Sequence, residues 1–274
     1  MRSKTGKKRY NRDMETEQIR MVEELAANAW PPEITQTLGG WRLRYTGGNS
    51  RRVNSVWANL PPDDLPLETC LDLVEDFYRR RGAPACYQLC PASLPEGLRE
   101  ALLARGYVEW AHTSVRVKTI AGLLAATAPL PVEVETAGSL REEWFETYTG
   151  ASGYSPESLP IRRGIFQRIG PEAQYVLIRQ DGMPAATGLG VAERGWMGVF
   201  CVVTVPGLRR QGLAGAVMRA LAEWGKTRGA QQVYLQVMED NLSALRLYDK
   251  LGFQFLFVCV FCIHGDLLNK LLHD

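Results

Sequence analysis

The chain has 274 residues, of which 46% are apolar and 23% charged, with a formal net charge of +2 at pH 7. This length suits two domains of about 130 residues, and the composition allows two hydrophobic cores. The small net charge does not indicate a nucleic-acid or membrane partner. No run of about 18 apolar residues occurs, and the basic start of the chain carries no apolar signal region. We therefore predict a cytoplasmic protein.

The cysteines are predicted to be reduced, buried thiols, and we expect no metal site. Cys259-x-x-Cys262 has the spacing of a metal or redox pair, but it lies in a strand-like run and no second pair with this spacing accompanies it. In a strand this spacing directs the two side chains to opposite faces. The other cysteines are Cys70, Cys86, Cys90 and Cys201.

The first half of the chain begins with six basic residues within residues 1–12, which predict a short disordered tail. A helix capped by Asp13 or Thr16 then runs to about Trp30, where two prolines stop it. The glycine-rich turn at residues 47–49 predicts a hairpin. The predicted strands are residues 41–45, 53–57, 86–89 and 107–118, and the predicted helices are 67–81 and 95–105.

Residues 121–131, which are rich in Ala and Pro, are the predicted linker between a first domain (13–120) and a second domain (132–274). The periodicity of the second domain alternates between strand and helix. Its predicted strands are 131–135, 175–179, 184–192, 196–205, 232–237 and 253–258. Its predicted helices are 138–149, 157–169, 213–228 and 243–251.

One stretch of the second half, Val202 to Met218, indicates an anion site. A β-branched run ends at a proline, turns through Arg209 and Arg210, and passes after Gly212 into the helix. Gly212 lets the backbone approach a ligand, and the free N–H groups of the first helical turn point into the same space. These donors, the helix dipole and the two arginines suit a pyrophosphate. A plain connection with solvated arginines is the alternative.

A second motif follows at the expected spacing. The predicted strand 232–237 is followed by a turn and helix cap at residues 239–241, and the predicted helix 243–251 is closed by Gly252. Together the two motifs resemble the GNAT superfamily of acyl-CoA-dependent N-acyltransferases, over roughly residues 131–263.

The resemblance implies a coenzyme A site. The strand end would hold the pantetheine and the thioester carbonyl, and the loop with the helix start would hold the pyrophosphate. By position these residues are Val202, Val203, Thr204, Arg209, Arg210, Gln211, Gly212, Leu213 and Ala214. Asn241 matches the asparagine that approaches the coenzyme arm, and Tyr248 matches the usual general acid.

The resemblance also assigns the helix pair at residues 138–169 to the wall of the acceptor site. Tyr148, Tyr154 and Trp196 are candidate acceptor contacts, with hydrophobic packing as the alternative.

The two halves repeat each other. Gly82 aligns with Gly229 at an offset of 147, and Gly106 aligns with Gly252 at an offset of 146. A constant offset across different elements indicates a duplicated fold. We therefore predict an α/β protein of two tandem GNAT-like domains, each a mixed, mostly antiparallel twisted sheet flanked by helices. This plan resembles a bacterial two-domain GNAT group.

The first copy is predicted to be degenerate. It carries Pro62-Asp63-Asp64-Leu65-Pro66-Leu67 where the phosphate loop would be, and Leu102 where Tyr248 would be. Aspartates repel a pyrophosphate and prolines remove donors, so this copy should not bind the coenzyme in the usual way.

The implied reaction is transfer of an acetyl group from acetyl-CoA to a primary amine of a small molecule, amino acid or peptide. A backbone N–H near Val203 would stabilise the oxyanion, and Tyr248 would protonate the departing thiolate. Gln236 stands where some relatives carry a basic glutamate, which leaves Glu193, Glu239 and His264 as candidates by sequence neighbourhood only. Loss of the amine proton to water would favour an α-amine (pKa ~7.7–8.0) over a lysine side chain (pKa ~10.4).

Two other functions stay open from the sequence. A non-catalytic coenzyme A-binding sensor or scaffold would keep the cradle without transfer. A nucleic-acid or ribosome-associated module would use the basic tail, although six charges on a flexible arm give only nonspecific binding. The acceptor, the acyl chain length and the oligomeric state are not encoded in any motif that we recognise.

Overall fold

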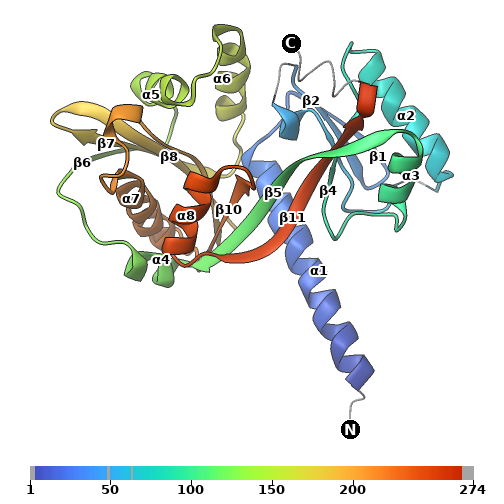
Figure 1. The fold of residues 1–274 in the computed structure, drawn as a ribbon, viewed down its shortest axis with the longest axis horizontal. Helices are drawn as coiled ribbons and strands as arrows, with labels where there is room; N and C mark the ends of the chain where they lie inside the picture. Colours follow the sequence, from blue (N-terminus) through green and yellow to red (C-terminus); the bar gives the residue numbers. More distant parts are fainter. Residues whose placement is uncertain (1–3, 48–49, 63, 267–274) are drawn as a thin grey trace. The chain divides into compact units, whose positions relative to one another are not determined.

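The computed structural model describes residues 4–47, 50–62 and 64–266, with side chains from residue 15 onward. The chain packs as two compact units (Figure 1). Unit 1 is drawn from residues 1–24, 32–114 and 257–274, and unit 2 from residues 25–31 and 115–256. None of the helices that the structure describes has the length and apolar character needed to span a membrane.

Unit 1 is built on a mixed sheet with the strand order β1-β2-β3-β4-β11. Strands β3 and β4 are parallel, whereas the pairs β1–β2, β2–β3 and β4–β11 are antiparallel. Helices α2 and α3 supply apolar faces to its core, which includes Trp41, Leu71, Phe77 and Leu102. The elements are β1 (Ile34–Leu38), β2 (Trp41–Tyr45), β3 (Val56–Trp57), α2 (Leu67–Arg79), β4 (Cys86–Leu89), α3 (Leu98–Ala104) and β11 (Gln254–His264).

Unit 2 has the strand order β5-β10-β9-β8-β7-β6, to which β5 contributes only residues 115–119, because its residues 107–114 belong to unit 1. The β9–β10 pair is parallel, and the pairs β6–β7, β7–β8 and β8–β9 are antiparallel. The strands are β5 (Tyr107–Thr119), β6 (Glu133–Ala137), β7 (Glu172–Gln180), β8 (Met183–Glu193), β9 (Trp196–Thr204) and β10 (Gln232–Met238). The helices are α4 (Ile120–Ala126), α5 (Glu142–Ser152), α6 (Leu159–Gln167), α7 (Leu213–Thr227) and α8 (Leu242–Lys250).

The sheet of unit 2 separates two apolar layers, because side chains alternate along a strand. Val176 and Ile178 of β7 belong to the core that α7 and α8 cover. Tyr175 faces the other way and packs against Trp144 of α5 and Phe166 of α6. Figure 1 shows α5 and α6 on one side of β7 and β8, with α7 on the other.

Both units confirm the predicted α/β fold, and they repeat one order of elements. The strand pairs β3–β4 and β9–β10 are both parallel, and in each unit a helix, α2 or α7, connects them. The last strands of the two repeats do not follow chain order. Chain order would assign β11 to the second copy, yet it pairs with β4, and its residues 257–264 belong to unit 1. Strand β5 is divided, since residues 107–114 belong to unit 1 and residues 115–119 to unit 2, and the strand lies next to β10 in the strand order.

Several predicted boundaries are wrong. Helix α1 (Lys4–Ala29) begins at Lys4 and not at Asp13 or Thr16, so residues 4–12 do not form the predicted tail, and residues 1–3 lie outside the described part. Lysine and arginine are good helix formers, which explains the extension. The predicted linker also contains helix α4, which Thr119 caps and whose Ile120 and Leu123 are buried in the core of unit 2.

Two further corrections concern the strands. Strand β1, which pairs with β2 over its whole length, was not predicted because Thr35, Gln36 and Thr37 hide its apolar pattern. The predicted strand 53–57 shrinks to Val56–Trp57, since residues 51–53 form a 3₁₀ turn. The predicted domain boundary also moves, because residues 257–264 of β11 belong to unit 1.

A buried polar layer joins α1 to the sheet of unit 1. Glu23 is 1% exposed and Arg44 is 2% exposed. Gln88 connects them, since its Nε2 donates to Glu23 Oε2 at 2.6 Å and its Oε1 accepts from Arg44 Nη2 at 2.7 Å. The Cys259 thiol donates to Glu23 Oε1 at 3.1 Å. Burial raises the pKa of Glu23 and lowers the pKa of Arg44 to about 10.

We predict that Glu23→Gln changes the pH dependence of stability. The folded state raises the pKa of Glu23 above its unfolded value, so the folded state binds more protons and the glutamate becomes less favourable as pH rises above about 4.5. The melting temperature of the wild type should therefore fall, relative to that of the variant, between pH 4 and pH 8. Scanning calorimetry across that range tests this, with the exposed Glu17→Gln as the control. A constant difference would contradict it.

Candidate functional site

Strands β9 and β10 part near their carboxyl ends. Their parallel register runs from Trp196 opposite Gln232 to Val199 opposite Leu235 and ends there. β9 continues to Thr204 and β10 to Met238 without further pairing to each other. Residues 202–204, the predicted pantetheine segment, therefore lie on the β9 side of this gap.

A β-bulge in β9 causes the parting. Leu189 of β8 pairs with Phe200 of β9, and Thr187 of β8 pairs with Val203 of β9. The step between these pairs is two residues along β8 but three residues along β9. The extra residue is Cys201, which has a φ of 54°. The Thr187 hydroxyl donates to the Cys201 carbonyl at 3.1 Å and holds it. Such a bulge bends its strand, and here it turns the end of β9 away from β10.

The predicted phosphate loop follows directly. After a 3₁₀ turn (Pro206–Leu208), Arg210 and Gly212 have positive φ values of 68° and 86°, and α7 begins at Leu213. Ala216 is the first residue whose N–H bonds within the helix, to Gly212 O at 3.1 Å. The N–H groups of the three residues before Ala216 therefore have no intrahelical acceptor. Arg209, Arg210 and Gln211 are exposed, so this loop can receive a negatively charged ligand.

Tyr248 lies on α8 in the core of unit 2, against Phe253 at a ring distance of 5.7 Å. The residue is 8% exposed, and desolvation raises its pKa to about 12. Among the described residues, none hydrogen-bonds its hydroxyl. The phenol is therefore protonated at neutral pH and able to donate to a group outside the protein.

Asn241 caps α8, as the sequence predicts. Its Oδ1 accepts from Ala244 N at 3.2 Å and from the Ser243 hydroxyl at 3.0 Å. The side chain is exposed, and its amide N–H₂ is left for a ligand.

The three candidate bases have different surroundings. Glu193 accepts two hydrogen bonds from Asn28 Nδ2, at 3.2 and 3.1 Å, and Glu239 is exposed. His264 belongs to unit 1, where its ring packs against Tyr107. None of these contacts supports a role in proton removal.

Of the predicted acceptor contacts, Tyr148 and Tyr154 lie together, with their hydroxyls 3.1 Å apart. Tyr148 is 4% exposed and stacks on Trp144, so it also packs the aromatic layer. Trp196 opens β9, six residues before Val202, which separates them by about 20 Å along a strand. The structure therefore does not bring Trp196 to the strand end.

The equivalent stretch in unit 1 differs in its chemistry. Pro66 is the N-cap of α2 and makes no side-chain cap, and Leu102 is fully buried in the core. Asp63 lies outside the described residues. All six cysteines of the chain are free thiols, of which Cys90 and Cys201 are half-buried and not buried as predicted.

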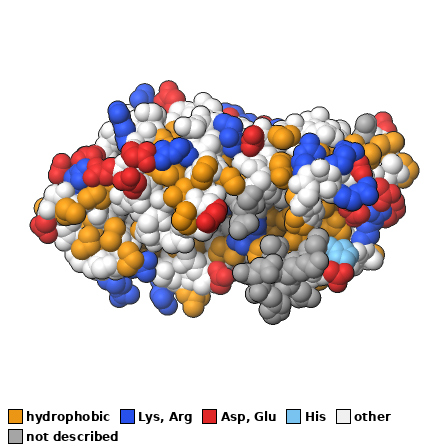
Figure 2. Space-filling model, turned by 90° about the horizontal axis from the view of Figure 1, so that it is seen from above, with side chains coloured by type: hydrophobic (Ala, Val, Ile, Leu, Met, Phe, Trp, Pro, Cys, Tyr) orange, Lys and Arg blue, Asp and Glu red, His pale blue; other side chains and the backbone are white. Residues whose placement is uncertain are grey.

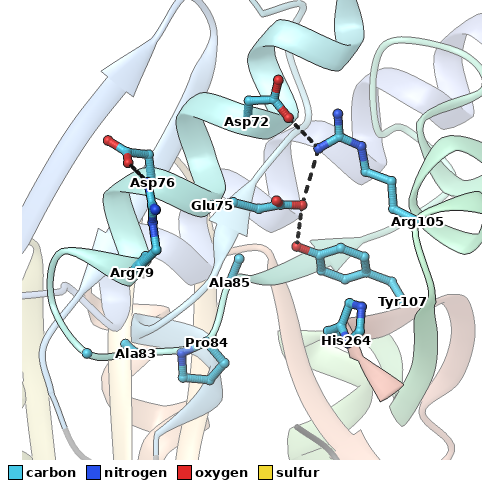
Figure 3. Close-up of a pocket in the computed structure, with 11 residues that line it drawn as sticks. Asp72, Glu75, Asp76, Arg79, Ala83, Pro84, Ala85, Arg105, Tyr107 and His264 are labelled. Atoms are coloured by element: carbon cyan, nitrogen blue, oxygen red, sulfur yellow. Dashed lines mark hydrogen bonds and ion pairs between the residues drawn. The ribbon is translucent and has the colours of Figure 1, made fainter. Parts of the chain in front are cut away.

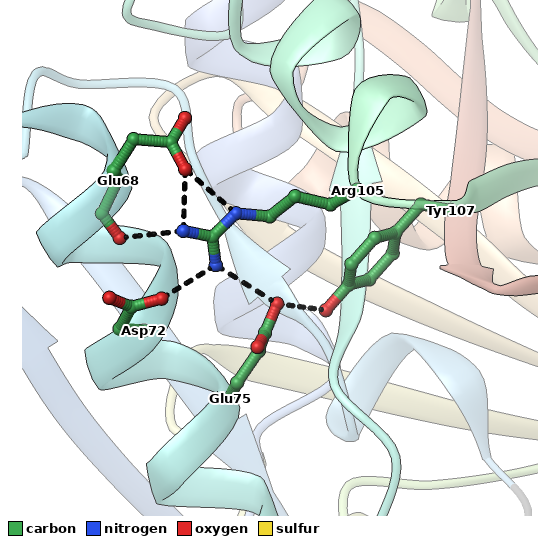
Figure 4. Close-up of polar contacts among 5 residues, drawn as sticks. All are labelled: Glu68, Asp72, Glu75, Arg105 and Tyr107. Atoms are coloured by element: carbon green, nitrogen blue, oxygen red, sulfur yellow. Dashed lines mark hydrogen bonds and ion pairs between the residues drawn. The ribbon is translucent and has the colours of Figure 1, made fainter.

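Unit 1 also contains a pocket of about 920 Å³ between α2, the 82–85 loop and the ends of β5 and β11 (Figure 3). Three carboxylates of α2 surround the single guanidinium of Arg105 (Figure 4). The Arg105 guanidinium forms ion pairs with Glu68, with Asp72 at 2.8 Å and with Glu75 at 3.3 Å. The Tyr107 hydroxyl donates to Glu75 at 3.1 Å. These groups satisfy one another, so we interpret the cluster as a structural tie between α2 and β5.

The comparisons with known proteins agree with the geometry. Residues 16–257 match the family model described as "Probable histone acetyltransferase Rv0428c C-terminal". The chain is also 32% identical over 240 residues to YobR of Bacillus subtilis (strain 168), described as an uncharacterized N-acetyltransferase, covering 86% of this chain and 94% of that protein. The chain belongs to the GNAT family of N-acetyltransferases.

Solved structures share the GNAT fold. A GCN5-related N-acetyltransferase from Kribbella flavida superposes with a TM-score of 0.67 at 19% identity, covering 90% of this chain and 95% of that one. A tandem GNAT protein from the clavulanic acid biosynthesis pathway gives a TM-score of 0.58 at 13% identity, covering 72% and 70%. The family and fold expected from the sequence are thus confirmed, and the chain is a GNAT acetyltransferase.

We predict that Thr187→Val impairs this acetyltransferase by loosening the bulge. The variant keeps the side-chain shape but removes the hydrogen bond from the Thr187 hydroxyl to the Cys201 carbonyl. Small misplacements near a reacting group reduce rates by up to roughly 100-fold. The rate of acetyl transfer should fall roughly 10- to 100-fold. Thr147→Val, which removes a hydroxyl from the surface of α5, is the matched control. Equal rates in both variants would show that the bulge is not needed.

Proposed function

We propose that unit 2 transfers an acetyl group from acetyl-CoA to a primary amine of a small molecule, amino acid or peptide. The observation that carries this proposal is the parting of β9 and β10 directly before the Gly212 loop. Unpaired strand backbone and free helix N–H groups then lie on one continuous stretch of chain, residues 202–215. This combination can bind a thioester arm at one end and a pyrophosphate at the other.

The coenzyme contacts are proposed from that arrangement and the family. Val202, Val203 and Thr204 would pair with the pantetheine amides, as an added strand would. Arg209, Arg210, Gln211, Gly212, Leu213 and Ala214 would surround the pyrophosphate. A Cβ at Gly212 would add bulk where φ is 86°, a conformation that glycine adopts without strain. The Asn241 amide would reach the coenzyme arm.

In the proposed reaction the neutral amine attacks the thioester carbon, and the C–S bond then breaks. The register with β8 directs the Val203 N–H toward Thr187, because Val205 N donates to Ala185 O and hydrogen-bonded pairs alternate along an antiparallel ladder. The neighbouring Thr204 N–H faces away from β8 and would stabilise the developing oxyanion in its place. The Tyr248 hydroxyl would give its proton to the departing sulfur. With a pKa of about 12, the Tyr248 phenol keeps its proton until the C–S bond breaks. Proton transfer to sulfur becomes more favourable as negative charge develops on the departing thiolate.

The amine would lose its proton to solvent, since Gln236 cannot accept one and the three candidate bases have other surroundings. This route favours an α-amine, because more of it is neutral at pH 7. Unit 1 would have no transfer activity of its own, since Leu102 and the Pro62–Leu67 stretch replace the required groups.

We predict that Tyr248→Phe lowers kcat by roughly 100-fold or more, the usual contribution of a general acid, and leaves acetyl-CoA affinity unchanged. Because the pKa of Tyr248 is about 12, the wild-type rate should rise with pH and show no descending limb below pH 10. Thiol release in a panel of amines measures both effects, with Tyr45→Phe of unit 1 as the control.

Two results would contradict parts of this proposal. Equal turnover in wild type and Tyr248→Phe at every pH would exclude the acid role. Binding of acetyl-CoA without transfer to any amine of the panel would favour the coenzyme-binding sensor or scaffold.

A further inference from the structure

Arg162 of α6 differs from Arg163, the next residue of the helix, in its surroundings. Its guanidinium lies over the Tyr154 ring, with Cζ 3.2 Å from the ring centroid, and its Nε is buried without a hydrogen-bond partner. In the described part of the chain no carboxylate forms an ion pair with it. The next residue, Arg163, instead makes a two-pronged pair with Glu142 at 2.8 and 2.6 Å.

The position of Arg162 connects it to the bulge of β9. Tyr154, beneath the guanidinium, shares a hydrogen bond with Tyr148. Helix α5, which carries Tyr148, contacts β9. Burial and, after it, the Cys201 thiol raise the pKa of both Tyr148 and Tyr175, and Tyr175 packs against α5 and α6, so the bulge residue lies on this face of the sheet. A series of neighbouring side chains thus leads from α6 to the carboxyl end of β9: Arg162, Tyr154, Tyr148 and Cys201.

A guanidinium in this setting lacks its usual partner. Arginine binds carboxylates through two parallel N–H bonds, and a buried N–H without an acceptor is unfavourable. The aromatic ring supplies a cation–π contact and leaves the N–H groups at the guanidinium edge available. An anion beside that edge would accept hydrogen bonds from these N–H groups and balance the charge of the guanidinium.

We propose that Arg162 binds the carboxylate of the acyl acceptor, so that the acceptor is a free amino acid. This inference rests on the proposed function, because it assumes that the α5–α6 face receives the acceptor. The carboxylate at Arg162 directs the α-amine toward Cys201 and the end of β9. Amines without a carboxylate lose this contact, and the site discriminates against them.

Equilibrium binding to the full-length chain tests the carboxylate site without requiring turnover. The probes are L-phenylalanine, L-leucine and L-methionine, each beside its own amide, titrated by calorimetry in the presence of saturating coenzyme A. At least one acid should bind the wild type, and it should bind more tightly than its amide. Arg162→Gln should weaken that acid roughly 10- to 100-fold and leave the amide unchanged.

Two variants control for structural effects. Arg163→Gln removes an adjacent arginine of the same helix and should leave the preference for the acid intact. Arg162→Lys keeps the charge without the planar fork and should retain part of the preference. Equal binding of acid and amide by the wild type, equal loss of both in Arg162→Gln, or no binding of any acid would overturn the inference.

Turnover of the same probes separates this inference from the proposed function. Acid binding that depends on Arg162, without acetyl transfer to any probe, would keep the carboxylate site and contradict the proposed transfer. Transfer to acids and amides at equal efficiency would keep the transfer and overturn the carboxylate site.

Discussion

The arrangement of the site depends on one backbone constraint, the extra residue in β9. A parallel pair that stayed in register to its end would use its own N–H and C=O groups and leave none for a ligand. Cys201 interrupts the register, and the buried Thr187 hydroxyl fixes its carbonyl. The strand end, the loop and the start of α7 then follow in sequence, so one short segment supplies all of the proposed coenzyme contacts except Asn241.

Small residues position α7 against the same strands. A Cβ at Gly188 would come within 2.3 Å of Val217 Cγ1, and a Cβ at Gly190 within 3.1 Å of Leu221 and Trp224 side-chain atoms. These glycines let α7 pack closely on β8. Unit 1 repeats the parallel pair and the connecting helix but fills one face of its sheet with Glu23, Gln88 and Arg44. The same arrangement of a parallel strand pair and a connecting helix therefore supports a buried polar layer in unit 1 and an unpaired strand end in unit 2.

The sequence predicts the local elements of the site well, because their signals are local. The β-branched run, Gly212 and the Asn241 cap each specify their own backbone conformation, and all three form the local elements that the sequence predicts. The pairing of β11 with β4 and of β5 with β10 could not be predicted, since pairing between distant strands leaves no local pattern. The Ala-rich helix α4 was misjudged because its composition also fits a linker.

The acceptor side shows the same limit. Trp196 was selected for its residue type, although the predicted strand 196–205 already places it at the opposite end from Val202, as β9 confirms. Arg162 was missed because it is adjacent to another arginine in the sequence. Its difference from Arg163 is the absence of a carboxylate partner, which is a tertiary property. The two arginines are the same residue type and differ only in the groups that their guanidinium groups contact.

We propose above that the chain has one site that binds the coenzyme, and that this site lies in unit 2. The most direct test is the stoichiometry of acetyl-CoA binding to the purified full-length protein, measured by calorimetry. We expect one site per chain, and we expect Gly212→Asp to abolish it, because the aspartate adds bulk and negative charge beside the pyrophosphate. Two sites per chain, no binding, or unchanged affinity in Gly212→Asp would contradict this account.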